Sequence, residues 1–106
     1  LLITKQKYPD WLILEIGADR PGDIKSVASW LKTDVVVVTR FAPVPVHVEF
    51  FSSPEAVFAE KAELVRSLKQ GGTLVLSHDD EKVKELASLA VNAKILTFGF
   101  SKASLV

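Results

Sequence analysis

The sequence contains no cysteine and no methionine among its 106 residues. Without cysteine the chain can form neither a disulfide framework nor a thiolate metal site. This absence is consistent with a cytoplasmic protein, and we expect that location. Methionine is missing at the first position as it is everywhere else, which indicates a fragment or an excised domain.

An excess of charge of one sign is also lacking, because thirteen basic and thirteen acidic side chains cancel. Domains that bind nucleic acid usually carry a basic excess, so we expect no nucleic-acid partner. No apolar run approaches the length that crosses a bilayer, and the first residues lack the charged-then-apolar order of a signal peptide. We therefore expect no membrane partner.

What is present is the composition of a globular protein, with 48% hydrophobic and 25% charged residues. The length fits one domain. Apolar runs of strand length alternate with segments that carry a helical apolar stripe. The pattern predicts strands at residues 11–16, 34–39, 73–77 and 94–98, and helices at 22–32, 54–70 and from about 79 onward. This order predicts an α/β fold with a parallel sheet, right-handed crossovers and helices on both faces.

The first predicted strand contains one carboxylate, Glu15, in an otherwise apolar run. An isolated charge in a buried strand is costly unless a partner neutralises it, and a metal ion is one such partner. The alternative is an edge carboxylate that pairs with Arg20 or Arg40. The link after this strand leads to Pro21, which suits the first turn of a helix.

Further polar residues follow the carboxyl ends of the predicted strands, where ligands of open parallel sheets bind. They are His47 in the long loop 40–53, and then Ser77, Asp79 and Asp80. Taken singly, His47 reads equally as an ordinary loop histidine and the two aspartates as a helix cap with a solvated acid. Their shared place at one rim of the sheet indicates a binding site.

The predicted helix 54–70 places a lysine within its apolar stripe. That stripe consists of Val57, Phe58, Leu64, Val65 and Leu68. Lys61 projects into its middle, whereas Glu60 lies outside it. A buried lysine has a lowered pKa, and its neutral amine is then nucleophilic. The alternative is that the Lys61 side chain reaches the rim and keeps its charge in water.

Several ordered motifs resemble the central ATP-binding domain of the Mur ligase family. Residues 14–18 (LEIGA) and 20–24 (RPGDI) are similar to its E-(M/L)-G-A-x-x-P-G-E-I segment. Residues 38–51 resemble its T-N-x-G-x-A-H-L-E-x-F loop, and residues 59–63 its A-K-x-E segment. Residues 72–80 and 96–99 resemble G-G-T-x-V-L-N-A-D-D and L-T-F-G. The chain departs from this pattern where Arg40 and Ser77 replace asparagines.

The resemblance implies a three-layer αβα fold with a mostly parallel sheet, similar to P-loop NTPases. Residues 1–106 would be a single domain, the latter part of a Mur ligase central domain that lacks the Walker A strand and loop. No G-x-x-x-x-G-K-[ST] sequence occurs in the chain. We therefore expect the isolated 106 residues to be catalytically inactive.

The resemblance also implies a function. The parent would be an ATP-dependent ligase of peptidoglycan precursor synthesis, which activates a carboxylate as an acyl phosphate for attack by an amine. Its cofactors would be ATP and Mg²⁺, and its partners a nucleotide and a UDP-linked peptide precursor bound through other domains. The alternative is a non-catalytic or degenerate α/β module with a nucleotide-binding or regulatory role.

By the same resemblance, individual residues acquire roles. Glu15 and His47 would be magnesium ligands. Lys61 would be the catalytic lysine, carrying a carbamate that helps hold a second magnesium. Ser77, Asp79 and Asp80 would lie near the adenine and ribose of ATP.

Overall fold

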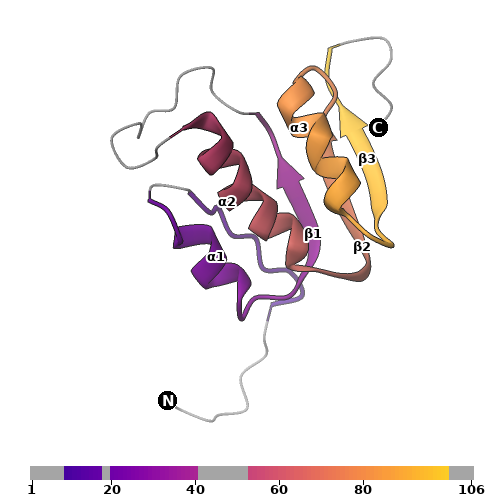
Figure 1. The fold of residues 1–106 in the computed structure, drawn as a ribbon. Coiled ribbons are helices and arrows are strands. Elements are labelled where there is room, and N and C mark those ends of the chain that lie inside the picture. The colour runs from indigo at the N-terminus through magenta and orange to yellow at the C-terminus, as the bar shows by residue number, and fades with distance from the viewer. Residues whose placement is uncertain (1–8, 18–19, 41–52, 101–106) are drawn as a thin grey trace, which may run out of the picture.

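The computed structural model describes residues 9–17, 20–40 and 53–100. Helices and strands alternate along these residues (Figure 1). In chain order they are α1 (Asp23–Ala28), β1 (Thr33–Val38), α2 (Pro54–Arg66), β2 (Leu68–Ser77), α3 (Glu81–Glu85), the 3₁₀ helix η1 (Leu86–Leu89) and β3 (Lys94–Phe98).

The three strands form one sheet in the order β1-β2-β3, and both pairs are parallel. Val37 pairs with Val75, which pairs in turn with Leu96. Parallel neighbours need a crossover connection, and α2 and α3 with η1 supply the two crossovers. The predicted α/β fold with a parallel sheet is therefore confirmed.

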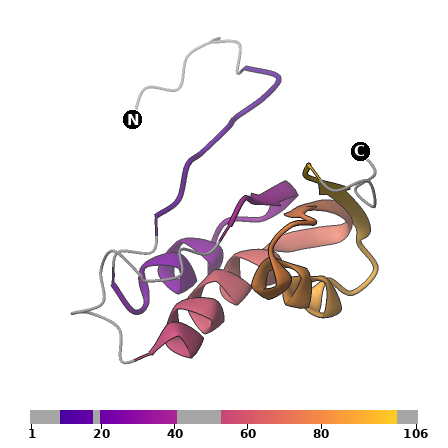
Figure 2. The ribbon, with the colours of Figure 1, turned by 90° about the horizontal axis from the view of Figure 1, so that it is seen from above.

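The helices lie on one face of this sheet, and α1 lies beside α2 (Figures 1 and 2). The core between the sheet and the helices consists of Val36, Val38, Ala62, Val65, Leu74, Leu76, Val83 and Leu86. The opposite face carries Val35 and Val37, which are 47% and 53% exposed. Helices on both faces were predicted, but the described residues form only two of the three expected layers.

The prediction of a buried strand at residues 11–16 is wrong for this structure. The segment forms no strand, and Trp11 and Ile13 are 78% and 89% exposed. Figure 2 shows it running away from the sheet. A strand needs a hydrogen-bonded neighbour, and none of the described strands pairs with these residues. An apolar composition favours burial but does not itself provide that partner.

Helix α1 ends four residues before its predicted end. The Ser29 hydroxyl donates to the Ser26 carbonyl at 2.6 Å, and the Trp30 amide donates to the Val27 carbonyl at 3.3 Å. Serine side chains compete in this way with the helical hydrogen bonds. The chain then turns directly into β1.

Helix α2 also ends earlier than predicted, and β2 begins before the two glycines that were expected to separate them. The cause is Ser67, which is only 1% exposed. Its hydroxyl donates to the Leu64 carbonyl at 2.6 Å and lies 3.0 Å from the Thr33 hydroxyl oxygen. This contact joins the end of α2 to β1, so that Leu68 already pairs with Thr33.

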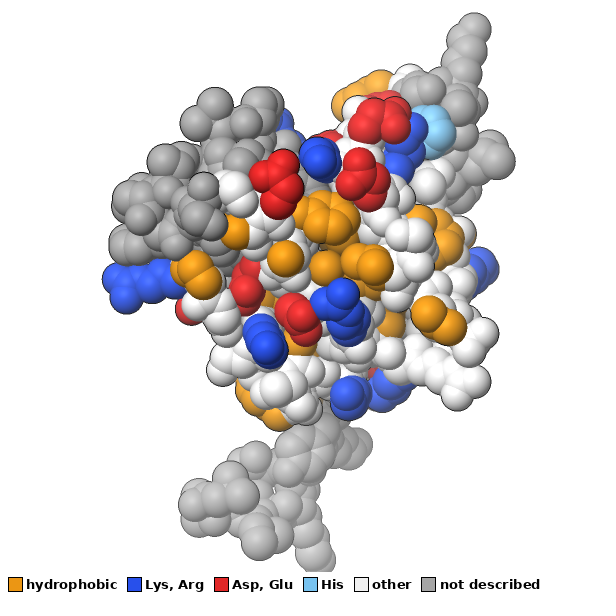
Figure 3. All heavy atoms as spheres, viewed as in Figure 1, with side chains coloured by type: hydrophobic (Ala, Val, Ile, Leu, Met, Phe, Trp, Pro, Cys, Tyr) orange, Lys and Arg blue, Asp and Glu red, His pale blue; other side chains and the backbone are white. Residues whose placement is uncertain are grey.

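The remaining boundaries agree with the sequence. Ser53 caps α2 by accepting from the Ala56 amide at 3.2 Å, and β3 spans the residues predicted for the last strand. Charged side chains of both signs are spread over the helical face, and apolar ones gather near its centre (Figure 3). Among the described residues, no helix combines the length and apolarity that a membrane span requires.

Candidate functional site

The candidate site lies where β2 and β3 end, because the carboxyl ends of parallel strands share one edge of the sheet. Two hydrogen bonds of 2.7 Å hold the segments that follow these strands together. The His78 amide donates to the Phe98 carbonyl, and the Phe100 amide donates to Oδ2 of Asp79. The loop after β2 is therefore held in place by the chain that follows β3.

Ser77 and Asp79 both take part in shaping this loop. Ser77 is 8% exposed, and its hydroxyl oxygen accepts from the Asp79 amide at 3.3 Å. Asp79 remains exposed while its carboxylate holds the Phe100 amide. These two of the three predicted nucleotide contacts thus lie at the carboxyl edge of the sheet, and both already have intramolecular partners.

Asp80 caps helix α3. Its Oδ1 accepts from the amides of Lys82 at 3.0 Å and Val83 at 3.2 Å. These amides belong to the first turn of the helix and have no partner within it. The alternative interpretation of Asp80 as a helix cap is therefore confirmed.

Lys61 occupies the middle of α2 and is half-buried. Burial lowers its pKa, because a partly desolvated amine holds a proton less well, and the nearby Asp80 carboxylate partly opposes this by raising the pKa. The lowered pKa that the apolar stripe predicts is confirmed in direction. The fold also brings Lys61 close enough to Asp80 for their charges to interact, although they are far apart in sequence.

Glu15 does not occupy the predicted buried position. It is exposed in a segment without strand structure, so its charge does not need a partner to compensate for burial. His47 lies outside the described residues. Among the residues that the structure describes, no group of three or more His, Cys, Asp and Glu side chains could hold a metal ion.

The residues that could hold Mg²⁺ must therefore be judged by their chemistry. Carboxylate oxygens are the ligands that Mg²⁺ prefers, and Glu15 could supply one. A carbamate on Lys61 would supply two more. The described side chains fit magnesium in donor type, but they complete a ligand set only together with the modified lysine, with bound phosphates or with water.

Glu60 is a feature of the site region that the sequence pattern missed. The helical stripe places it on the polar face of α2, yet its side chain is buried, with 9% of the residue exposed. Its Oε1 accepts a hydrogen bond from the Lys25 amide at 3.0 Å. The spacing of apolar residues in α2 indicates which face packs against the sheet. It does not reveal that α1 packs beside α2 and buries Glu60.

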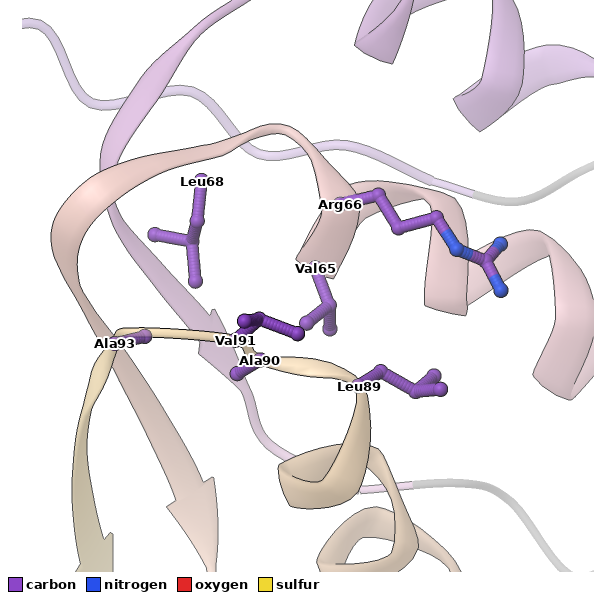
Figure 4. Close-up of a pocket in the computed structure, with 7 residues that line it drawn as sticks. All are labelled: Val65, Arg66, Leu68, Leu89, Ala90, Val91 and Ala93. Carbon is purple, nitrogen blue, oxygen red and sulfur yellow. The ribbon is translucent and has the colours of Figure 1, made fainter.

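A shallow crevice of about 230 Å³ lies at the other end of the sheet (Figure 4). It is lined by Val65, Arg66, Leu68, Leu89, Ala90, Val91 and Ala93. These residues surround the amino ends of β2 and β3, away from the edge where ligands of such sheets bind. Its single charged group, Arg66, already pairs with Glu63 at 2.7 Å. The crevice is not part of the candidate site.

The whole chain matches one known protein family. The family described as the Mur ligase middle domain matches residues 1–106, which is the whole chain. The chain belongs to the Mur ligase middle-domain family.

Three relatives illustrate this membership. UDP-N-acetylmuramoyl-tripeptide–D-alanyl-D-alanine ligase of Mycobacterium leprae (strain TN) is 35% identical over 90 residues, which cover 85% of this chain and 17% of the relative. The enzyme of the same name from Mycobacterium bovis (strain ATCC BAA-935 / AF2122/97) is 34% identical over 88 residues, which cover 83% of this chain and 17% of the relative.

The third relative is the Buchnera aphidicola subsp. Acyrthosiphon pisum (strain APS) enzyme of that name. It is 26% identical over 102 residues, 96% of this chain and 22% of the relative. This Mur ligase middle-domain chain therefore spans about one fifth of the length of the relatives that it matches.

Proposed function

We propose that this chain is the latter part of the central domain of an ATP-dependent ligase of peptidoglycan precursor synthesis. The match of the Mur ligase middle domain to the whole chain carries the proposal. The parent would phosphorylate a carboxylate with ATP and let an amine attack the acyl phosphate, releasing phosphate and forming an amide. By analogy with the names of the relatives, the precursor is a UDP-N-acetylmuramoyl tripeptide and the amine is D-alanyl-D-alanine. A cytoplasmic location, supported by the absence of cysteine, belongs to the same proposal.

In this proposal Lys61 is the catalytic lysine. The lowered pKa leaves a larger fraction of its amine neutral at a given pH. The neutral nitrogen can bond to the carbon of CO₂ and release a proton to solvent, which forms a carbamate. This modification would replace a half-buried positive charge with a negative one that needs a cation nearby.

Glu15 and His47 would hold magnesium, and the carbamate of Lys61 would help hold a second magnesium; these ions would supply positive charge opposite the phosphoryl groups. Asp80 contributes through its fixed position, because its two bonds to the α3 amides keep the carboxylate near Lys61. Ser77 and Asp79 shape the loop that would lie against the adenine and ribose.

The test of this function uses the intact parent protein. Ligation of D-alanyl-D-alanine to the UDP-linked tripeptide should require both ATP and Mg²⁺. Lys61→Ala should lower kcat by at least about a hundredfold, the usual effect of removing a group that stabilises charge in a transition state. Added bicarbonate should not restore it.

The matched control is Lys69→Ala. Lys69 is an exposed lysine on β2 that pairs with Asp34 at 3.2 Å, and its removal should leave kcat unchanged. With ¹³C-bicarbonate, a carbamate carbon signal should appear in the unsubstituted protein and in Lys69→Ala but not in Lys61→Ala. Full ligation by Lys61→Ala would overturn the role of this lysine.

A second candidate function is a module that binds nucleotide without catalysis. It is favoured by the intramolecular bonds that already occupy Ser77 and Asp79, and by the exposure of Glu15. Because both functions include ATP binding, activity separates them: a protein with the second function would bind ATP in calorimetry but would neither hydrolyse it nor join the two substrates.

A further inference from the structure

Glu60 is a buried carboxylate that the proposed chemistry does not use. It lies on α2 directly before Lys61 and is 9% exposed. Burying a carboxylate is costly unless hydrogen bonds compensate for the lost water. The compensating donor is the backbone amide of Lys25, 3.0 Å from Oε1, on a helix 35 residues away in sequence.

The amino terminus of α1 explains why this bond matters. The first amides of any helix have no acceptor within the helix, and the residue before it usually supplies one from its side chain. That residue is Gly22 here, which has no side-chain oxygen and forms no side-chain cap. The Asp23 amide bonds instead to the Arg20 carbonyl at 3.2 Å. Glu60 provides, for the third residue of α1, the acceptor that the local sequence lacks.

The same bond joins two helices that also pack against each other. Helix α1 lies beside α2 (Figure 1), and its buried residues are Ile24 and Ala28. Apolar packing alone lets a helix of six residues shift along its neighbour, because such contacts are not directional. A hydrogen bond to one backbone amide defines the position along the helix as well.

We propose that Glu60 is a positioning residue, which caps α1 from α2 and thereby fixes the position of α1 relative to Lys61. The inference rests on the proposed function, in which Glu15 and Lys61 serve one site. Glu15 precedes α1 in the chain, and Lys61 follows Glu60. One carboxylate thus joins the helix that follows Glu15 in the chain to the helix that carries Lys61.

The experiment compares Glu60→Ala and Glu60→Gln in the intact parent protein. The amide side chain of glutamine retains an oxygen that can accept from Lys25, whereas alanine retains none. The matched control is Glu63→Ala, which removes a carboxylate from the same helix that pairs with Arg66.

The first measurement is hydrogen exchange at the Lys25 amide. We expect exchange about fivefold faster in Glu60→Ala, the effect of losing one capping hydrogen bond, and near the unsubstituted rate in Glu60→Gln and Glu63→Ala. The second is the KM for ATP with magnesium, measured where every variant is folded. We expect it to rise about tenfold in Glu60→Ala, since small misplacements of binding groups are costly, and to be restored in Glu60→Gln.

Unchanged exchange at Lys25 in Glu60→Ala would overturn the cap. Faster exchange with unchanged kcat and KM would show a purely structural bond and overturn the positioning role. If Glu60→Ala does not fold, the test rests on Glu60→Gln, which should behave as the unsubstituted protein does. A change in Lys25 exchange or in the KM for ATP in Glu60→Gln would then overturn the proposal. Failure of the proposed function is distinct, because it appears as absent ATP-dependent ligation in the unsubstituted protein.

Discussion

At the scale of single residues, Lys61 combines two opposing influences on one amine. Burial lowers its pKa and the Asp80 carboxylate raises it. The balance matters for the proposed chemistry, because only the neutral amine reacts with CO₂. The two influences can be separated by substitution, since one comes from the surroundings of α2 and the other from the cap of α3.

Lys61→Met should stabilise the folded protein at neutral pH. The folded-state pKa lies below the usual value of about 10.5, so the unfolded chain binds the proton more tightly and stability rises with pH between the two values. The cost of the charged amine is therefore fully present below the folded-state pKa. Methionine removes it, and we expect the free energy of unfolding at pH 7 to rise.

Denaturant unfolding from pH 7 to 10.5 in CO₂-free buffer measures this difference. The gap between Lys61→Met and the unsubstituted protein should narrow as the pH approaches the upper limit. Lys69→Met, at an exposed position, should show no such trend. Equal pH profiles for the two variants would contradict the lowered pKa.

Asp80→Asn separates the charge of this residue from its capping role. The amide oxygen of asparagine can still accept from the α3 amides, so the helix should keep its stability. Without the carboxylate, the pKa of Lys61 should fall further, because Asp80 acts to raise it. NMR titration of the lysine Nζ measures the shift. Asp80→Ala should in addition destabilise the protein by about 1 kcal/mol through loss of the cap, and an unchanged Lys61 pKa in both variants would contradict the interaction.

At the scale of elements, the two neighbouring glycines of β2 serve different purposes. Gly71 has a φ of 81° and open space around it, so only its backbone conformation requires glycine. At Gly72 a Cβ atom would lie 2.9 Å from the Lys69 carbonyl oxygen and 3.0 Å from that of Asp34. Gly72 therefore permits the close approach of β1 and β2 at the irregularity in their pairing.

The positive φ at Gly71 and the lack of space at Gly72 predict different effects of substitution on stability. Gly71→Asn should destabilise the folded protein less than Gly71→Ala, because asparagine tolerates a positive φ. Gly72→Ala should destabilise by about 2 kcal/mol, as overpacking does, and Gly72→Asn should be no better. Thermal unfolding of the four variants checks this. Equal costs for alanine at both positions, with no benefit from asparagine at Gly71, would contradict the distinction.

The elements also indicate how far sequence patterns reach. The predicted strand at β3 matches the structure, and β1 matches within one residue at each end, because β-branched and aromatic residues are enriched in strands. The N-caps Ser53 and Asp80 follow from local chemistry. The ends of α1 and α2 do not, because Ser29 and Ser67 end them through hydrogen bonds that a stripe of apolar residues does not reveal.

At the scale of the whole molecule, the described residues leave two apolar surfaces exposed. One is the sheet face with Val35 and Val37, and the other is the segment that contains Trp11, Leu12 and Ile13, each at least 73% exposed. Contiguous exposed apolar surface favours association.

The isolated 106-residue chain should therefore self-associate at micromolar concentration. Trp11→Gln should reduce this association, because it removes the largest apolar side chain of the exposed segment. Trp30→Gln, which replaces a tryptophan 68% exposed beyond the end of α1, serves as the control and should have little effect. Sedimentation velocity measures the association, and a monomer at all concentrations would contradict the prediction.

The sequence by itself determined the order of elements from α1 to β3, the parallel sheet and the position of Lys61 within an apolar stripe. These follow from interactions between residues close in the chain and from the periodicity of burial. Only the tertiary structure decided that Glu15 is exposed, that Asp80 lies near Lys61 and that Glu60 caps α1. Each depends on which elements become neighbours in space, and a pattern along one element contains no information about the partner that packs against it.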